Sequence, residues 1–214
     1  MILETLVSGL FQENIYLLGC VKTRRAVLID PGDNAAVRGL IKWIGDHDFA
    51  LDYILLTHGH IDHIGGVADL QRRFSAVVCL HRSDEILLQG SAAQARMFDL
   101  PAPTMFAVDR WISHGDRLTV GEIELEVIET PGHTPGSVCF YLPDRDTLFS
   151  GDTLFWGSVG RTDLSGGSTT NLLTSIHQRL LTLPPQTVVY SGHGPVTTIA
   201  REKESNPFLN DAVI

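Results

Sequence analysis

Residues 57–63, Thr-His-Gly-His-Ile-Asp-His, place three histidines and an aspartate within six positions of the chain. These candidate ligands are too close together for one helix face, but a turn can direct them around metal ions. Divalent ions of intermediate softness, such as Zn²⁺, bind both imidazole and carboxylate ligands. The preceding apolar run, 53–56, is typical of a buried parallel strand. We therefore expect a metal site after a strand, where open α/β sheets bind ligands. The candidate ligands are His58, His60, Asp62 and His63.

The composition indicates one globular domain. With 214 residues and 43% apolar residues, the chain can bury one substantial core or two modest ones, and we expect a single domain over residues 1–214. No apolar stretch has the length of a membrane span, and no basic segment precedes an apolar one at the N-terminus, so we expect a cytoplasmic protein without membrane association. The net charge of −9 argues against nucleic-acid binding. Cys20, Cys79 and Cys139 lie in apolar runs and are predicted to be buried free thiols.

Apolar periodicity predicts alternating strands and helices. Predicted strands cover residues 2–7, 15–20, 26–30, 53–56, 76–80, 121–129, 138–142, 147–150 and 187–190, and predicted helices cover 34–47, 67–74, 83–89 and 169–183. Three strands without an intervening helix predict an antiparallel start. Residues 90–110 are expected to form a long irregular stretch that covers a site. The order suits two sheets packed face to face with helices outside, a four-layer αββα sandwich with its site along the upper edge.

Three further candidate ligands also follow strands and glycine-rich turns. His133 lies in a segment with two prolines and two glycines, which would fix its backbone. Asp152 and His193 each follow a predicted strand through one glycine. A strand-end aspartate alone is more often a turn or cap residue, but the repeated layout favours ligands. The remaining histidines lack this context and are not expected to bind metal: His47, His81, His114 and His177.

Four motifs together resemble the metallo-β-lactamase superfamily, in its short glyoxalase II-like branch. They are His58-Gly59-His60-Ile61-Asp62-His63, Gly132-His133-Thr134-Pro135-Gly136-Ser137, Gly151-Asp152-Thr153-Leu154-Phe155 and Gly192-His193-Gly194-Pro195. The similarity extends from Asp30-Pro31-Gly32 to Asn206-Pro207-Phe208-Leu209. It implies the four-layer αββα fold of the metallo-β-lactamase type.

The resemblance also implies a binuclear site. His58, His60 and His133 would hold one ion, Asp62, His63 and His193 the other, and Asp152 would bridge them. Zinc is the first expectation, with iron and manganese as alternatives. A bridging Asp152 without a nearby cysteine is unlike a class B1 β-lactamase. Asp30 matches an acid that steadies the ligand loop in this superfamily, although a plain turn aspartate is the alternative.

The resemblance further implies that such a site hydrolyses thioesters. Two ions about 3.5–4 Å apart hold a hydroxide at neutral pH, which would be the nucleophile. Asp62 can accept a proton or orient the attacking oxygen, and Asp152 holds the ions in place, so both are predicted to be catalytic. The resemblance implies a small-molecule thioester substrate, of the S-lactoylglutathione kind. A monomer and a homodimer both stay open.

Substrate recognition is less constrained. Glyoxalase II enzymes carry a helical C-terminal extension whose basic residues contact glutathione, and this chain is expected to lack it. The expectation bears on whether glutathione is the thiol carrier of the substrate, and not on the hydrolytic reaction. Arg161 falls where the family often places a basic residue beside a substrate carboxylate. A surface ion pair with Asp163 is the alternative. Apolar side chains that could line an acyl pocket, or belong to the core, are Met97, Phe98, Met105, Phe106 and Trp156.

Three other functions fit the same residues less well. A persulfide dioxygenase would hold one Fe(II) with His58, His133 and Asp152, and the segment 160–163 resembles that branch too. The short length and the motif at 206–209 favour the hydrolase. A nuclease of the superfamily would need an additional domain or a basic arm. A purely structural metal site would not leave a position open for water.

Overall fold

The computed structural model describes residues 1–210, and the chain forms two compact units. Unit 1 comprises residues 1–112 and 119–123, and unit 2 comprises 113–118 and the chain from 124 onward. Each unit has its own sheet and apolar core. The prediction of one domain over residues 1–214 stays a prediction, and its last four residues lie outside the described part of the chain.

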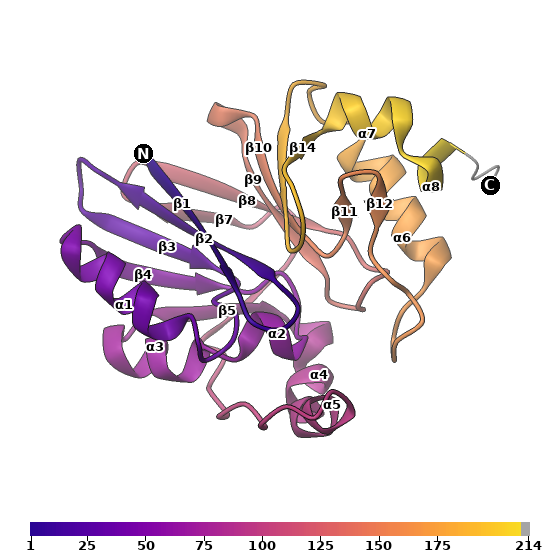
Figure 1. Cartoon of the computed structure of the whole chain (residues 1–214). Helices are drawn as coiled ribbons and strands as arrows, with labels where there is room; N and C mark the ends of the chain where they lie inside the picture. The colour runs from indigo at the N-terminus through magenta and orange to yellow at the C-terminus, as the bar shows by residue number, and fades with distance from the viewer. Residues whose placement is uncertain (211–214) are drawn as a thin grey trace. The chain divides into compact units, whose positions relative to one another are not determined.

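The sheet of unit 1 is mixed, with strand order β1-β2-β3-β4-β5-β6. Figure 1 labels its first five strands. Its strands are β1 (Ile2–Ser8), β2 (Glu13–Cys20), β3 (Arg25–Ile29), β4 (Ala50–Leu55), β5 (Val77–His81) and β6 (Arg110–Ile112). The first three strands pair antiparallel, which confirms the predicted antiparallel start. From β3 to β6 the pairing is parallel, as predicted for the apolar run before the histidines.

The helices of unit 1 are α1 (Val37–Asp46), α2 (Ile61–Ile64), α3 (Val67–Phe74), the 3₁₀ turn η1 (Arg82–Asp84), α4 (Glu85–Gln89) and α5 (Ser91–Met97). In α1, the periodic residues Val37, Leu40 and Ile44 are buried in one core with residues of α3 and the sheet. This confirms the helices predicted at 34–47, 67–74 and 83–89. The stretch at 90–110, predicted to be irregular, contains α5, because Ser91–Met97 is rich in alanine, the strongest helix former.

The second sheet, most of which belongs to unit 2, has strand order β14-β13-β10-β9-β8-β7. Its strands are β7 (Arg117–Val120), β8 (Ile123–Glu129), β9 (Val138–Leu142), β10 (Thr147–Gly151), β13 (Val188–Ser191) and β14 (Thr197–Thr198), and β11 (Leu154–Phe155) pairs with β12 (Ser158–Val159) as a separate hairpin. The residues Thr119, Val120 and Ile123 of these strands fall within unit 1. In β8, Ile123, Leu125 and Val127 are buried, as its alternation predicts. β10 pairs parallel with β13, so their carboxyl ends share one edge.

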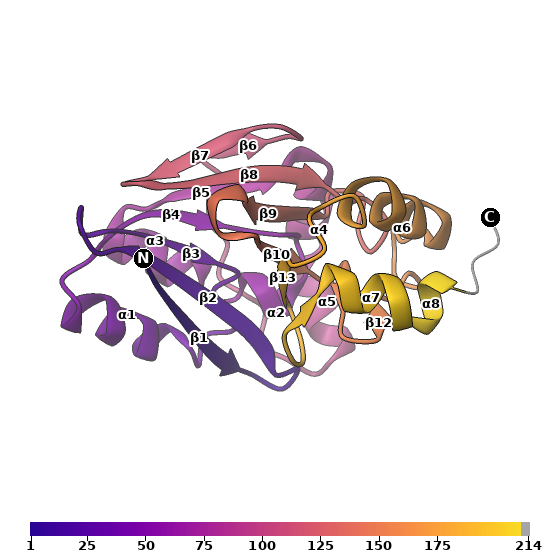
Figure 2. The same cartoon turned by 90° about the horizontal axis from the view of Figure 1, so that it is seen from above.

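The helices of unit 2 are α6 (Thr169–Ser175), the π-helix η3 (Ile176–Leu180), α7 (Ile199–Ser205) and α8 (Pro207–Asn210), with a 3₁₀ turn η2 (Pro143–Arg145). Figure 2 shows α6 and α7 as separate helices. Leu172 of α6 and Ile176 and Leu180 of η3 are buried in one core with residues of the sheet. The predicted helix 169–183 is therefore helical to Leu180 but turns into a π-helix. The prolines at 184 and 185 cannot continue a helix, so the helical segment ends before them.

The predictions for the cysteines and for membrane-spanning helices can be compared with the structure. Cys20, Cys79 and Cys139 are buried thiols that form no disulfide, as predicted. Within residues 1–210, no helix is both long and apolar enough to cross a membrane.

Candidate metal centre

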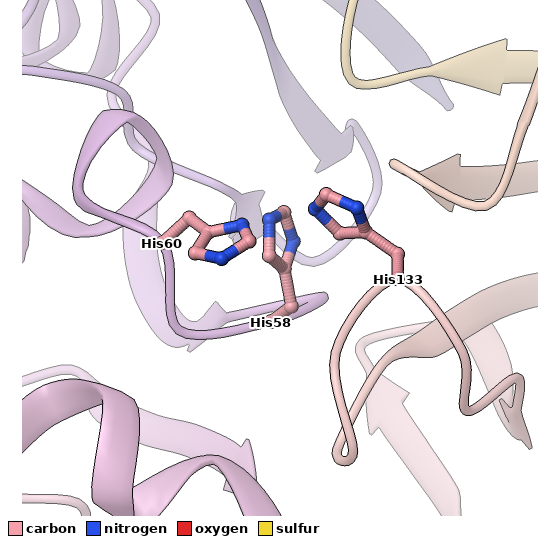
Figure 3. Close-up of side chains that lie close together, drawn as sticks. All are labelled: His58, His60 and His133. Carbon is pink, nitrogen blue, oxygen red and sulfur yellow. The ribbon is translucent and has the colours of Figure 1, made fainter. Parts of the chain in front are cut away.

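The four candidate ligands of unit 1 lie where β4 ends. His58 and His60 extend from the loop after β4 (Figure 3), and Asp62 and His63 lie in the short helix α2. The imidazole of His58 has its ring centroid 4.8 Å from that of His60 and 4.1 Å from that of His63. The loop therefore gathers three buried imidazoles at the carboxyl end of a parallel strand, the place that the sequence predicts.

Asp30 anchors this loop from the end of the neighbouring strand β3. Its Oδ1 accepts the amide of Thr57 at 2.8 Å, and its Oδ2 accepts the Thr57 hydroxyl at 2.6 Å. Nδ1 of His63 lies 3.0 Å from the same Oδ2. Asp30 is buried and has a φ of 46°, a left-handed conformation that aspartate tolerates better than most residues.

These contacts fix which nitrogen of each imidazole carries the proton. The Asp30 carboxylate can only accept, so His63 donates from Nδ1 and presents the lone pair of Nε2. The single hydroxyl proton of Thr57 goes to Asp30, so Thr57 Oγ1 accepts from Nδ1 of His58 at 3.0 Å. His58 therefore also presents Nε2. Metal-binding histidines characteristically donate the other nitrogen to such a partner, and the arrangement fits a metal site.

Asp84 is a second anchor that sequence reasoning missed. This aspartate is fully buried, and its Oδ2 accepts the amide of Gly59 at 2.9 Å. A Cβ on Gly59 would lie 3.2 Å from the Asp84 carbonyl oxygen and 3.0 Å from Leu87 Cβ, so the loop packs tightly there. Its position within a predicted short helix gave no sign of this contact, because aspartates near helix starts are common caps.

The three candidate ligands of unit 2 also gather at strand ends. His133 occupies the turn between β8 and β9 (Figure 3), Asp152 follows β10 and His193 follows β13. Nε2 of His133 lies 3.6 Å from Oδ2 of Asp152, and Nε2 of His193 lies 3.6 Å from Oδ1. Two ligands roughly 2.0–2.1 Å from one ion in tetrahedral geometry lie about 3.3–3.4 Å apart, so both spacings are slightly wide but close to ligand spacing. Asp152 thus turns one oxygen toward each imidazole, as a bridging carboxylate does.

Backbone contacts orient His133. Its Nδ1 donates to the carbonyl oxygen of Arg161 at 2.8 Å, so Nε2 is presented toward Asp152. The preceding Gly132 has a φ of 147°, and a Cβ there would lie 2.3 Å from the backbone of Leu172. Only glycine fits at this position, so the rigid turn around His133 depends on it.

The Arg161 side chain adopts the alternative that the sequence left open. Its Nε and Nη2 each donate to one oxygen of Asp163 at 2.8 Å, and both side chains are largely exposed. This pairing is the main cause that lowers the pKa of Asp163 to about 2. A role for Arg161 in substrate binding stays a prediction.

The apolar candidates for an acyl pocket differ in exposure. Met97, Met105 and Trp156 are exposed by 71%, 62% and 50%. Phe98 packs edge-on against Phe11, with ring centroids 5.1 Å apart, and Phe106 packs on the core of unit 1. The mostly exposed side chains do not form the wall of a closed cavity.

A cavity that sequence reasoning missed lies beside Asp62, within unit 1. Its volume is about 100 Å³, and its lining is mainly apolar. The β1–β2 turn contributes Leu10 and Phe11, α2 contributes Ile61, and Leu100 and Pro101 come from the irregular segment after α5. Part of the segment 90–110, which the sequence predicts to cover a site, therefore lines this cavity. No residue pattern in the sequence indicated the cavity itself.

The histidines that were not expected to bind metal have local contacts. His47 stacks on Trp43 with ring centroids 4.0 Å apart, and His81 accepts the amide of Ser83 through Nδ1 at 3.2 Å. His114 lies in the turn before β7, and His177 lies in the π-helix. None belongs to the two groups of candidate ligands.

Comparison with known proteins identifies the family. The chain belongs to the metallo-beta-lactamase superfamily, whose model matches residues 8–193. This confirms the predicted αββα fold, with two mixed sheets flanked by helices.

Among curated proteins, the chain is 41% identical to the "probable metallo-hydrolase YqgX" of Bacillus subtilis, covering 94% of each chain. It is 38% identical to the hydroxyacylglutathione hydrolase GloC of Haemophilus influenzae, covering 97% of this chain and 98% of that one.

Other similar proteins are named for activities other than thioester hydrolysis. The mouse mitochondrial persulfide dioxygenase ETHE1 is 36% identical, over 91% of this chain and 70% of its own. The crystal structure of the B3 metallo-beta-lactamase BLEG-1 is 42% identical, with a TM-score of 0.90, covering 98% of this chain and 100% of that one. The di-iron-bound structure of TTHA1623 is also 42% identical, with a TM-score of 0.86, covering 96% and 100%. The His and Asp clusters are consistent with a binuclear metal site and support a metal-dependent hydrolase of this superfamily.

Proposed function

We propose that this protein is a binuclear metal-dependent hydrolase of thioesters, with S-acylglutathione as the substrate class. The observation that carries the proposal is the orientation of three candidate ligands: His63, His58 and His133 have Nδ1 bonded to Asp30, Thr57 and the Arg161 carbonyl, respectively. The similarity to a hydroxyacylglutathione hydrolase over nearly the whole length of both chains supports the substrate class.

The two groups of ligands would act together. His58, His60 and His133 would hold one ion, Asp62, His63 and His193 the other, and Asp152 would bridge them. Two bound divalent ions would supply a water-derived nucleophile at neutral pH and polarise the thioester carbonyl. Zinc suits this donor set, and iron and manganese suit it too; the di-iron relative supports iron as an alternative.

The protein side chains would orient the reaction. Asp62 would accept the proton of the attacking water, because its carboxylate lies at the edge of the ligand cluster with Oδ2 3.7 Å from Nε2 of His63. Asp152 would keep the imidazoles of His133 and His193 in fixed positions, because each lies 3.6 Å from one of its oxygens. The acyl group would enter the apolar cavity beside Asp62, whose volume of about 100 Å³ suits an acyl group of a few carbons. Arg161 would leave Asp163 to pair with a carboxylate of the thiol carrier.

Three assays on one preparation test the substrate class. The wild-type protein, loaded with zinc or with iron(II), is given S-lactoylglutathione, glutathione persulfide or a chromogenic cephalosporin. We expect release of thiol from the thioester, without comparable oxygen uptake or β-lactam cleavage. Oxygen uptake with the persulfide and no thioester cleavage would overturn the proposal in favour of a dioxygenase.

The dioxygenase is the second candidate function. Its support is the 36% identity to a persulfide dioxygenase, together with ligands His58, His133 and Asp152 that would suffice for one Fe(II). The similarity to proteins named as hydrolases is somewhat higher, at 41% and 38% identity over at least 94% of this chain, and supports the hydrolase as the first proposal.

A further inference from the structure

The motif Asn206-Pro207-Phe208-Leu209 takes no part in the proposed chemistry, yet Asn206 is fully buried. Its Nδ2 donates to the carbonyl oxygen of Ser158 in β12 at 3.0 Å and to Oε2 of Glu202 at 2.8 Å. Its Oδ1 accepts the amide of Phe208 at 3.0 Å. Because both ends of the amide are bonded, Asn206 has one orientation and ties β12 to the C-terminal helices.

Glu202 completes this contact from α7. It is fully buried, and its Oε2 also accepts the amide of Gly157 at 2.8 Å. Its Oε1 accepts the Thr197 hydroxyl at 2.5 Å and Nη1 of Arg201 at 2.8 Å. Every one of these partners is a donor, so a glutamine amide at this position would direct its NH₂ group at other donors. The charged carboxylate is therefore specifically required.

Glu202 and Asn206, together the Glu202–Asn206 clasp, hold the turn of one hairpin. Gly157 lies in the turn between β11 and β12, and Ser158 is the first residue of β12. This hairpin begins two residues after Asp152 and leads directly into Gly160. The clasp thus fixes the far end of the segment that follows a candidate metal ligand.

The near end of the same segment packs on two candidate ligands. A Cβ on Gly160 would lie 1.9 Å from the carbonyl oxygen of Asp152 and 3.2 Å from Cβ of His133, so the segment passes close to both residues and only glycine fits. The next residue, Arg161, provides the carbonyl oxygen that accepts Nδ1 of His133 at 2.8 Å. The position of this carbonyl depends on the backbone of the hairpin and not on the exposed guanidinium.

We propose that Glu202 and Asn206 are positioning residues for the metal ligand His133. By holding the β11–β12 turn, the clasp places the Arg161 carbonyl where it fixes the orientation and tautomer of the His133 imidazole. The inference rests on the proposed metal centre, but it does not depend on the substrate class. Partners of this kind, one step beyond the metal ligands, typically change metal affinity by 10–100-fold when they are lost.

Metal binding by the full-length protein tests the clasp. Glu202→Gln and Asn206→Asp keep the shape of each side chain but disturb a donor or an acceptor. Thr147→Val is the control, because it removes a partly buried hydrogen bond from Thr147, at the start of β10, to the carbonyl oxygen of Arg145. Affinity is measured by competition with a chromophoric chelator, and ligand geometry by the absorption spectrum of bound cobalt(II). We expect about tenfold weaker binding and a changed spectrum in both clasp variants. The control should match the wild type in both measurements.

The contrary outcomes are distinct. Folded clasp variants with wild-type affinity and spectrum would overturn the positioning role, whereas a wild type without bound metal would overturn the proposed function itself. If both variants fail to fold, hydrogen exchange of wild-type residues 156–161 decides. Metal loading should slow exchange of the Gly157 amide, which the clasp binds, and leave the amides around Thr147 unchanged. Equal exchange at Gly157 with and without metal would overturn the inference.

Discussion

Oδ2 of Asp30 lies 3.0 Å from Nδ1 of His63, and the same oxygen accepts the Thr57 hydroxyl that orients His58. One carboxylate therefore sets the proton position of two imidazoles. The consequence is that Asp30 should control metal affinity without touching the metal.

Asp30→Asn tests this control. An amide has one acceptor oxygen, so its NH₂ group must face donors: the Thr57 amide in one orientation, or His63 Nδ1 and the Thr57 hydroxyl in the other. Either way the loop that carries the imidazoles loses part of its anchor. We expect metal affinity to fall by about 10–100-fold, measured by chelator competition. The matched control is Asp48→Asn, because Asp48 also has a positive φ, 54°, but is exposed and distant in sequence from the ligands. Equal affinities in the two variants would contradict the role of Asp30.

Gly132→Ala should destabilise unit 2 strongly. A φ of 147° excludes side chains, and the new Cβ would lie 2.3 Å from the Leu172 backbone. We expect a loss of about 3 kcal/mol or more in the free energy of unfolding, measured by urea denaturation of the metal-free protein. Gly45→Ala, in α1 with open space around the Cβ position, should instead gain about 0.5–1 kcal/mol. A Gly132→Ala protein as stable as wild type would show that this turn is not rigid.

Much of this architecture follows from the sequence. The periodic residues of α1 and β8 predict their own burial, and the glycine-rich strand ends predict where ligands gather. Contacts between distant segments escape such reasoning. Asp84 meets Gly59 across 25 positions, and Asn206 meets Ser158 across 48. β11 and β12 have two residues each, too few to show an alternation.

Burial of Cys139 predicts a loss of stability at alkaline pH. Desolvation raises the pKa of this thiol to about 12 from an ordinary value of 9.0. The unfolded thiol ionises near pH 9 while the folded one keeps its proton, so this stabilising contribution is complete below pH 9. It is lost as pH rises toward 12, by up to about 1.4 kcal/mol per pH unit.

Urea denaturation of the wild type and Cys139→Ala at pH 8, 9 and 10 measures this contribution. The difference in unfolding free energy between the two proteins should be constant below pH 9 and fall above it. A difference independent of pH up to pH 10 would refute the link to Cys139.

Arg161→Gln tests the predicted substrate contact. If the guanidinium exchanges Asp163 for a substrate carboxylate, the variant should raise KM for S-lactoylglutathione about tenfold with kcat nearly unchanged. The control is Arg117→Gln, another exposed arginine, whose Nη1 pairs with Glu124 at 2.9 Å. Because exposed pairs add little stability, both variants should keep the wild-type Tm. An unchanged KM in Arg161→Gln would leave Arg161 as a surface residue.

The binuclear hydrolase is tested most directly by metal analysis of the wild type and Asp152→Ala, combined with the rate of thiol release from S-lactoylglutathione. Asp152 places one carboxylate oxygen 3.6 Å from Nε2 of His133 and the other 3.6 Å from Nε2 of His193, so its loss would remove the proposed shared ligand. We predict about two ions per wild-type chain, fewer in the variant, and loss of thioester cleavage with the second ion. A single iron per wild-type chain, with persulfide-dependent oxygen uptake and no thioester cleavage, would contradict the account.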